Sequence, residues 1–151
     1  MKGHRTRKRK PIILAPGAGR SYPMGRISSV FKADGSETGH TYSVSEWWLE
    51  PNTKGPPPHM HEDDHAWYVI SGKMNVLIGK RWTELSRGSL VVIPGGVRHT
   101  FENRSMTERA GILSFNNQAG FEEDMPGISE WFIKHPPGDA ISIQNGKHGV
   151  A

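Results

Sequence analysis

Four histidines in two short stretches are the residues of this sequence best suited to chemistry. In the first stretch, His59, His61 and His65 stand at relative positions 0, 2 and 6, and an aromatic and β-branched run follows at 67–70. Alternate side chains of a β-strand share a face, so we expect these three imidazoles to point to one side, whereas a helix would scatter them. Neutral imidazole nitrogen suits zinc, copper, iron and nickel. The pattern therefore predicts a metal site on a strand.

A second stretch, residues 88–103, supplies the fourth histidine. Residues 90–93 form a short run that is apolar on both faces, which is typical of a buried strand. The Pro-Gly-Gly sequence at 94–96 is strong turn chemistry, and His99 then opens the next strand. If the two strand pairs lie side by side, His99 becomes a fourth ligand. We therefore expect one divalent transition metal per chain, held by His59, His61, His65 and His99.

Together the two stretches resemble the paired motifs of the cupin superfamily. The first family motif reads Gly, His-x-His, three residues, Glu, six residues, Gly; the second reads Gly, five residues, Pro-x-Gly, two residues, His, three residues, Asn. His59, His61 and Gly72 match the first motif, and the second is matched by Gly88, Pro94, Gly96, His99 and Asn103. The resemblance covers residues 55–103. It implies an all-β fold, a single antiparallel cupin β-barrel (jelly roll) of six to eight strands with a short C-terminal helix.

His65 departs from the family pattern, because cupins usually carry Glu at this position. In those members the carboxylate can act both as a ligand and as the general base. Four neutral imidazoles leave the metal its full +2 charge, which favours an anionic, bidentate oxygen ligand such as an enolate or a 1,2-diketone-like group. Imidazole ligands favour Fe, Ni, Cu or Zn over magnesium and calcium, and family sites of this kind also accept Mn. Glu46 or Glu50, on a strand expected to border the cavity, is the candidate replacement base.

Other side chains near the predicted ligands have two interpretations. Trp67 and Phe101 each follow a predicted ligand by two residues, so strand parity puts them on the ligand face. With Trp47 and Phe115 they could wall an apolar pocket for an aromatic or long-chain substrate, or they could simply pack the barrel. The acidic run at 62–64 either orients an imidazole through its second N–H or forms a solvated turn.

The remaining sequence predicts the elements that position these groups. The 18 glycines and 11 prolines among 151 residues suit many short strands rather than long helices. Strands are expected at 26–32, 41–50, 67–70, 74–78, 81–85, 90–93, from 99 onward and at 110–115, with a helix over 121–134, an extended lead-in at 11–24 and a short strand at 141–143. We see no internal repeat, so one barrel is predicted.

The chain divides into a basic tail at 1–10, a cupin domain at 11–138 and a C-terminal tail at 139–151. The basic tail carries six Lys and Arg and no acid, which leaves 13 basic and 15 acidic side chains in the rest. We interpret it as a solvated, disordered arm rather than a nucleic-acid contact, because no aromatic residues are interleaved to stack on bases. The apolar segment 11–15 is a candidate for exchange between two chains, and we expect a homodimer.

Absent features narrow the class of protein. There is no cysteine, which excludes disulfide and thiolate chemistry and is compatible with a reducing cytosol. The apolar run at 12–15 is too short for a secretory signal, and no run approaches the length of a membrane span. We therefore expect a cytoplasmic protein that acts on a small molecule and has no membrane partner.

The resemblance leaves several functions open. The flanking sequence, including residues 119–123, looks like that of proteins described as quercetin-dioxygenase-like cupins. This implies a mononuclear metal-dependent dioxygenase-like enzyme acting on a small enol or diketone-type substrate, including aromatic ones. The alternatives are a non-catalytic, ligand-binding or regulatory cupin, and a cupin isomerase or decarboxylase. Cupins share one fold across many chemistries, so the fold cannot choose among them.

Overall fold

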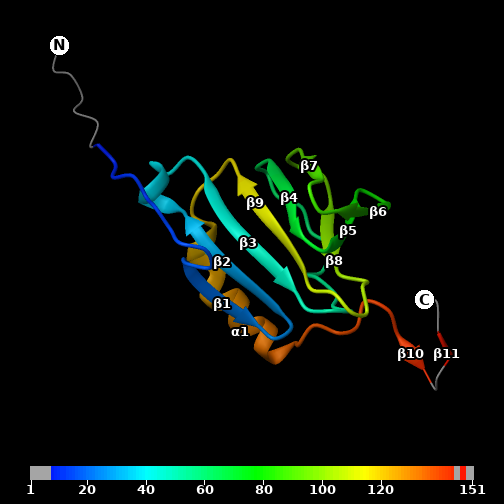
Figure 1. The fold of residues 1–151 in the computed structure, drawn as a ribbon. Helices are drawn as coiled ribbons and strands as arrows, with labels where there is room; N and C mark the ends of the chain where they lie inside the picture. Colours follow the sequence, from blue (N-terminus) through cyan, green and yellow to red (C-terminus); the bar gives the residue numbers. More distant parts are fainter. Residues whose placement is uncertain (1–7, 145–146, 149–151) are drawn as a thin grey trace, which may run out of the picture.

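A computed structural model describes residues 8–144 and 147–148. Its body consists of nine strands: β1 (Arg20–Met24), β2 (Ile27–Ala33), β3 (Ser43–Leu49), β4 (His65–Ser71), β5 (Lys73–Ile78), β6 (Arg81–Ser86), β7 (Leu90–Ile93), β8 (His99–Glu102) and β9 (Ala110–Asn116). They form a six-stranded sheet in the order β1-β2-β3-β9-β4-β7 and a three-stranded sheet in the order β6-β5-β8, and the paired strands are antiparallel (Figure 1). The predicted all-β jelly roll with one short C-terminal helix is confirmed.

The core lies between the two sheets and follows from the period-two pattern of the strands. In β2, Ile27 and Phe31 are fully buried, and in β5, Met74 and Val76 point into the same cluster. Burying a large apolar side chain contributes about 1.5–3 kcal/mol. The buried apolar side chains of the inward face therefore hold the two sheets together.

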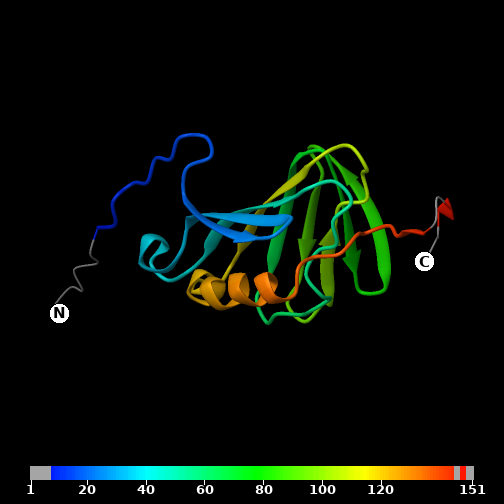
Figure 2. The same ribbon diagram turned by 90° about the horizontal axis from the view of Figure 1, so that it is seen from below.

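Helical structure is limited to three short elements in the described residues: the 3₁₀ turns η1 (Gly35–Thr38) and η2 (Phe121–Asp124) and the α-helix α1 (Met125–Lys134). Pro126 in the first turn of α1 suits a position whose N–H has no helical partner. Figures 1 and 2 show α1 lying along β1, and Met125 and Phe132 join the buried core. The predicted helix over 121–134 thus exists, with its first four residues in 3₁₀ form.

Two parts of the chain differ from the expectation. The lead-in at 11–24 contains β1, so the body has one strand more than the upper expected number. β1 carries Arg20, Ser21 and Pro23 and lacks an apolar pattern; Pro23 is tolerated because β1 is an edge strand. In the C-terminal tail, β10 (Ile143–Gln144) pairs with β11 (Lys147–His148), two residues later than the strand expected at 141–143.

The predicted basic tail falls mostly outside the described residues, since only positions 8–10 of it are described, and these are exposed. Among the helices that are described, none is both long and apolar enough to cross a membrane.

Candidate metal centre

The first three histidines lie at a crossing between the two sheets and not on one strand. His59 forms an isolated bridge with His99, with N···O distances of 3.1 and 2.8 Å, so it continues the edge of the three-stranded sheet beyond β8. β4, in the six-stranded sheet, begins only at His65. The prediction of one strand carrying His59, His61 and His65 was therefore wrong. The imidazoles come together because the loop between the sheets brings them to the same end of the barrel.

The turn of the second motif holds this loop in place. The N–H of Gly96 donates to the carbonyl of His61 at 2.7 Å, and the N–H of Gly95 donates to the Asp64 carboxylate at 2.8 Å. A Cβ on residue 95 would collide with the carbonyl oxygen of Glu62, so glycine is required for this close approach. The Pro-Gly-Gly turn thus fixes the backbone that carries the histidines.

All four predicted histidines gather in one cluster. Ring centroids lie 4.7 Å apart for His59 and His61, 4.6 Å for His59 and His99, 4.8 Å for His61 and His65, and 5.1 Å for His65 and His99. Their donor atoms form two overlapping sets, one of His59, His61 and His99 and one of His61, Asp63 and His65. Within each set the atoms lie within 4.8 Å of one another. Both sets share His61, so the cluster could hold a single ion.

Hydrogen bonds to backbone carbonyls fix the tautomer of two of the imidazole rings. The Nδ1–H of His99 donates to the carbonyl of Val97 at 2.8 Å, and that of His59 donates to the carbonyl of Pro57 at 2.8 Å. This tautomer leaves the lone pair on Nε2, and the buried Nε2 of His99 has no hydrogen-bond partner among the described residues. Leaving such an atom unsatisfied costs about 1–3 kcal/mol. A metal ion would satisfy it, so the site fits the predicted cofactor.

His65 has closer polar neighbours than the other three. Its Nε2 lies 2.9 Å from the Asn116 amide nitrogen and 3.2 Å from the Asp63 carboxylate. Asn116 also donates to Asp63 at 3.1 Å, and its amide oxygen accepts from Ser114 at 3.2 Å. Of the acidic run at 62–64, only Asp63 contacts a histidine in this way. Asn116 was missed by sequence reasoning, and its one signal was a polar residue ending a core strand.

Burial favours the neutral form of three histidines of the cluster. It lowers the pKa of His61 and of His99, and it lowers the pKa of His65 to about 4, although the Asp63 charge opposes the shift. Neutral imidazole is the form that binds metal ions. At neutral pH His61, His65 and His99 are therefore available as ligands.

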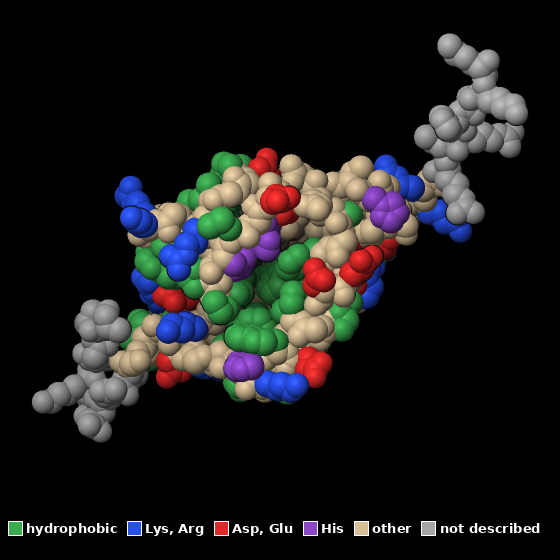
Figure 3. Space-filling view, turned by 180° about the vertical axis from the view of Figure 1, so that it is seen from behind, with side chains coloured by type: hydrophobic (Ala, Val, Ile, Leu, Met, Phe, Trp, Pro, Cys, Tyr) green, Lys and Arg blue, Asp and Glu red, His purple; other side chains and the backbone are tan. Residues whose placement is uncertain are grey.

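The histidines line one end of a cavity of about 370 Å³ that is open to the surface. Trp47, Trp67 and Phe101 line it, as predicted, together with Ser45 and Asn116. The face of the molecule turned away in Figure 1 is hollowed, and hydrophobic and histidine side chains gather there (Figure 3). Trp67 and Phe101 pack edge to face, with ring centroids 5.1 Å apart. The cavity thus has a polar end lined by imidazoles, and aromatic side chains line the rest of it.

Phe115, Glu46 and Glu50 lie away from this cavity. Phe115 is 41% exposed and stacks on Tyr42, because β9 turns Ser114 and Asn116 inward and Phe115 outward. Glu46 points to the outer face of β3 and pairs with Lys32 at 3.3 Å. Glu50 is exposed and pairs with Arg109 at 3.1 Å. The expectation that one of these acids faces the histidines is therefore wrong, because the alternation of side chains along the strand turns Glu46 outward.

The C-terminal segment supplies a wall that sequence reasoning did not assign to the site. Phe121, Ile128, Trp131 and Phe132 line the cavity. The Phe121 ring stacks on Phe31 at 5.9 Å and meets His61 edge to face at 6.2 Å. The helical spacing of 128, 131 and 132 was the available signal, but it indicated only that this face is buried.

A carboxylate network anchors Phe121. Asp34 accepts hydrogen bonds from the N–H groups of Gly120 and Glu122, both at 2.7 Å. Glu122 accepts from Arg20 at 2.7 and 2.8 Å and from the Tyr22 hydroxyl at 2.7 Å. These bonds lower the pKa of Glu122, with Arg20 as the main cause, and raise the pKa of Tyr22. The network fixes η2 against the sheet and holds Phe121 over the cavity.

Comparison with known proteins agrees with this architecture. A family model described as "Cupin domain" matches residues 45–115. A quercetin 2,3-dioxygenase of Bacillus subtilis is 26% identical over 149 residues, covering 96% of this chain but 43% of that protein. This chain therefore spans less than half of that relative.

Solved structures share the fold at low identity. The polyketide cyclase RemF of Streptomyces resistomycificus is 21% identical, with a TM-score of 0.61 over 78% of this chain and 90% of that one. A variant of oxalate decarboxylase from Bacillus subtilis is 16% identical, with a TM-score of 0.64 over 80% of this chain and 33% of that one. The two motifs, the two-sheet barrel, the histidine cluster and the family match lead to one conclusion: the chain contains a domain of the cupin superfamily.

Proposed function

We propose that this protein is a mononuclear metal-dependent, dioxygenase-like enzyme acting on a small enol or diketone-type substrate, including aromatic ones. The observation that carries the proposal is the buried Nε2 of His99, which has no hydrogen-bond partner among the described residues, within a cluster of four histidines that opens into an aromatic cavity. The resemblance to a quercetin 2,3-dioxygenase along 96% of the chain supports the reaction class.

The residues of the cluster divide into two roles. His59, His61 and His99 would hold the ion, since each offers a donor atom within 4.8 Å of the others. When bound, a divalent ion such as Fe, Mn, Ni, Cu or Zn supplies a Lewis acid that favours anionic oxygen ligands. His65 would complete the set or, with the Asp63 carboxylate 3.2 Å from its Nε2, hold the proton that an enol releases.

The cavity selects the substrate by shape and polarity. Trp47, Trp67 and Phe101 offer flat apolar surfaces to the body of a substrate, and Phe121 closes the cavity beside His61. The volume of about 370 Å³ lies at the small end of ligand pockets. A compact ring bearing adjacent oxygen atoms suits these dimensions.

Oxygen consumption tests the proposal. The protein is loaded in turn with Fe²⁺, Mn²⁺, Ni²⁺, Cu²⁺ and Zn²⁺ and mixed with quercetin, cyclohexane-1,2-dione or a simple 1,3-diketone. We expect metal-dependent oxygen uptake with at least one pair. The control is the variant in which all four histidines are alanine. Uptake that is equal in that variant would contradict the proposal.

A non-catalytic, ligand-binding cupin is the second candidate. It is favoured by one observation: no Asp or Glu lines the cavity among the described residues, so the base found in many family members is missing from its wall. Saturable binding of an enol or diketone, measured by calorimetry without turnover or oxygen uptake, would support this function over the first.

A further inference from the structure

The inner face of β3 and β9 carries a stripe of small polar side chains beside the histidines. Ser45 lies opposite Ser114 in the register of the two strands, and Asn116 follows two residues later on β9, opposite His65. Ser45, Ser114 and Asn116 all line the cavity, although each is buried. The stripe therefore leads from the histidine end of the cavity to a second polar position at Ser45.

Two members of the stripe are engaged with each other and with the histidine end. The Ser114 hydroxyl donates to the amide oxygen of Asn116 at 3.2 Å. The amide nitrogen of Asn116 lies 3.1 Å from the Asp63 carboxylate and 2.9 Å from Nε2 of His65. The hydroxyl proton of Ser114 and both polar ends of Asn116 are thereby used within the protein.

Ser45 differs, because its hydroxyl keeps an unused proton. The indole N–H of Trp47 lies 3.0 Å from the Ser45 hydroxyl oxygen. An indole N–H can only donate, so the Ser45 oxygen accepts this bond and its own proton stays available. That proton has no acceptor among the described residues. Buried polar groups are nearly always hydrogen-bonded, so a ligand in the cavity is the expected acceptor.

The charge of the cavity wall restricts what that acceptor can be. No Lys or Arg of the described chain lines the cavity. An ionised carboxylate next to Ser45 would therefore be buried without a counter-charge, which is strongly unfavourable. A hydroxyl, ether or carbonyl oxygen carries no such penalty. The oxygen that Ser45 binds is therefore a neutral one.

We propose that Ser45 forms a second subsite, in which its hydroxyl donates a hydrogen bond to a neutral oxygen on the side of the substrate remote from the histidines. The bond from Trp47 fixes the position of the Ser45 oxygen for this contact. The preferred substrates are thus enol or diketone rings that carry a further hydroxyl, ether or carbonyl oxygen across the ring. The inference rests on the proposed function, because it places the chelating oxygens at the histidine cluster.

Two ligands that differ in one oxygen atom test the subsite. Kojic acid and allomaltol carry the same chelating pair, a hydroxyl beside a ring ketone, but kojic acid has a hydroxymethyl group across the ring where allomaltol has a methyl group. Both are titrated by calorimetry into the Zn²⁺-loaded protein. We expect the parent to bind kojic acid about three- to tenfold more tightly than allomaltol, which is the effect of one hydrogen bond. In Ser45→Ala this preference should disappear, while the affinity for allomaltol should stay the same.

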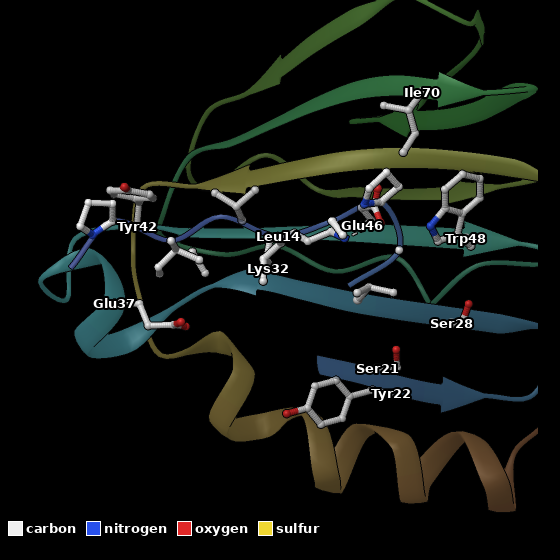
Figure 4. A pocket seen from close by; sticks show the side chains of 18 of the residues that line it. Leu14, Ser21, Tyr22, Ser28, Lys32, Glu37, Tyr42, Glu46, Trp48 and Ile70 are labelled. Carbon is white, nitrogen blue, oxygen red and sulfur yellow. Dashed lines mark ion pairs between the residues drawn. The ribbon is translucent and has the colours of Figure 1, made fainter. Parts of the chain in front are cut away.

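The matched control is Ser28→Ala. Ser28 lines a groove on the outer face of the six-stranded sheet (Figure 4), so this variant should keep the preference for kojic acid. Ser45→Ala leaves the Trp47 N–H without its acceptor, so a second variant combines it with Trp47→Phe. Trp47→Phe alone should keep the preference, and the double variant should lose it. Melting temperature and zinc content report that each variant is folded.

The outcomes separate this inference from the proposed function. If the parent binds both ligands equally, or if Ser45→Ala keeps the preference, the subsite is overturned and the chelating role of the histidines stands. If neither ligand binds the loaded parent, the subsite falls together with the enol-type substrate.

Discussion

The two faces of the six-stranded sheet differ in whether their titratable side chains are charged, although both faces are formed by alternate residues of the same strands. On β3, Ser45 and Trp47 face the cavity with the histidines, while Glu46 and Trp48 face the groove on the outer side. The outer face keeps ionised side chains and neutralises them in pairs such as Lys32 and Glu46. The inner face carries His65, whose pKa burial lowers to about 4, so that its imidazole stays neutral. Solvent access thus decides whether a face carries ion pairs or a ligand set.

Removing the metal should have the largest effect, and only the inner face should respond. A bound ion stabilises the folded state by roughly 3–4 kcal/mol when its free concentration is 100 to 1,000 times the dissociation constant. We expect a chelator to lower the melting temperature of the loaded protein by roughly 10 °C. The variant with alanine at His59, His61, His65 and His99 should not respond. A metal-dependent melting temperature in that variant would locate the ion elsewhere.

The second-largest effect should show whether His65 is a fourth metal ligand or only supports the other three. His65→Ala should weaken metal binding by about 10- to 100-fold, whereas His65→Glu should retain it because a carboxylate is the usual residue of the family at this position. Asp63→Asn should weaken binding less than His65→Ala. Calorimetric titration with Zn²⁺ or Ni²⁺ measures all three. If His65→Ala binds as tightly as the parent, the site consists of His59, His61 and His99.

The Glu122 network that holds Phe121 in place should make the stability of the fold depend on pH. The pKa of Glu122 is lowered from 4.5, mainly by the hydrogen bond from Arg20, so its contribution is present above pH 4.5 and is lost as the pH falls through the native value. We expect Glu122→Gln to lower the free energy of unfolding by about 1–2 kcal/mol at pH 7. The difference from the parent should shrink in acid. Urea unfolding at several pH values measures it, and a constant difference would contradict this role.

The smallest effect is expected on the outer face. Glu46→Gln removes one partner of the ion pair with Lys32, which at a partly exposed site should cost less than about 1 kcal/mol. Metal affinity should not change, because Glu46 lies across the sheet from the histidines. Thermal unfolding and metal titration of this variant check both points. A large loss of metal binding would mean that the two faces are coupled.

Strand chemistry and turn residues allowed most elements to be predicted, including the run at 90–93 with its bounds and the helical segment after residue 121. β1 could not be predicted, because an edge strand is held by its ladder with β2 and needs no apolar face. The contribution of Trp131 to the cavity wall could not be predicted either. A helical period reports that a face is buried but not what it is buried against.

The sequence by itself determined which histidines meet. The paired motifs identified His59, His61, His65 and His99 as one group, although the argument from spacing that put the first three on one strand was wrong. Only the tertiary structure decided what surrounds them. It set Asp63 and Asn116 beside His65, turned Glu46 and Phe115 outward, and brought Phe121 over the cavity from 22 residues beyond His99. Spacing along a chain constrains neighbours on one element, whereas contacts between elements depend on how two sheets and a helix pack together.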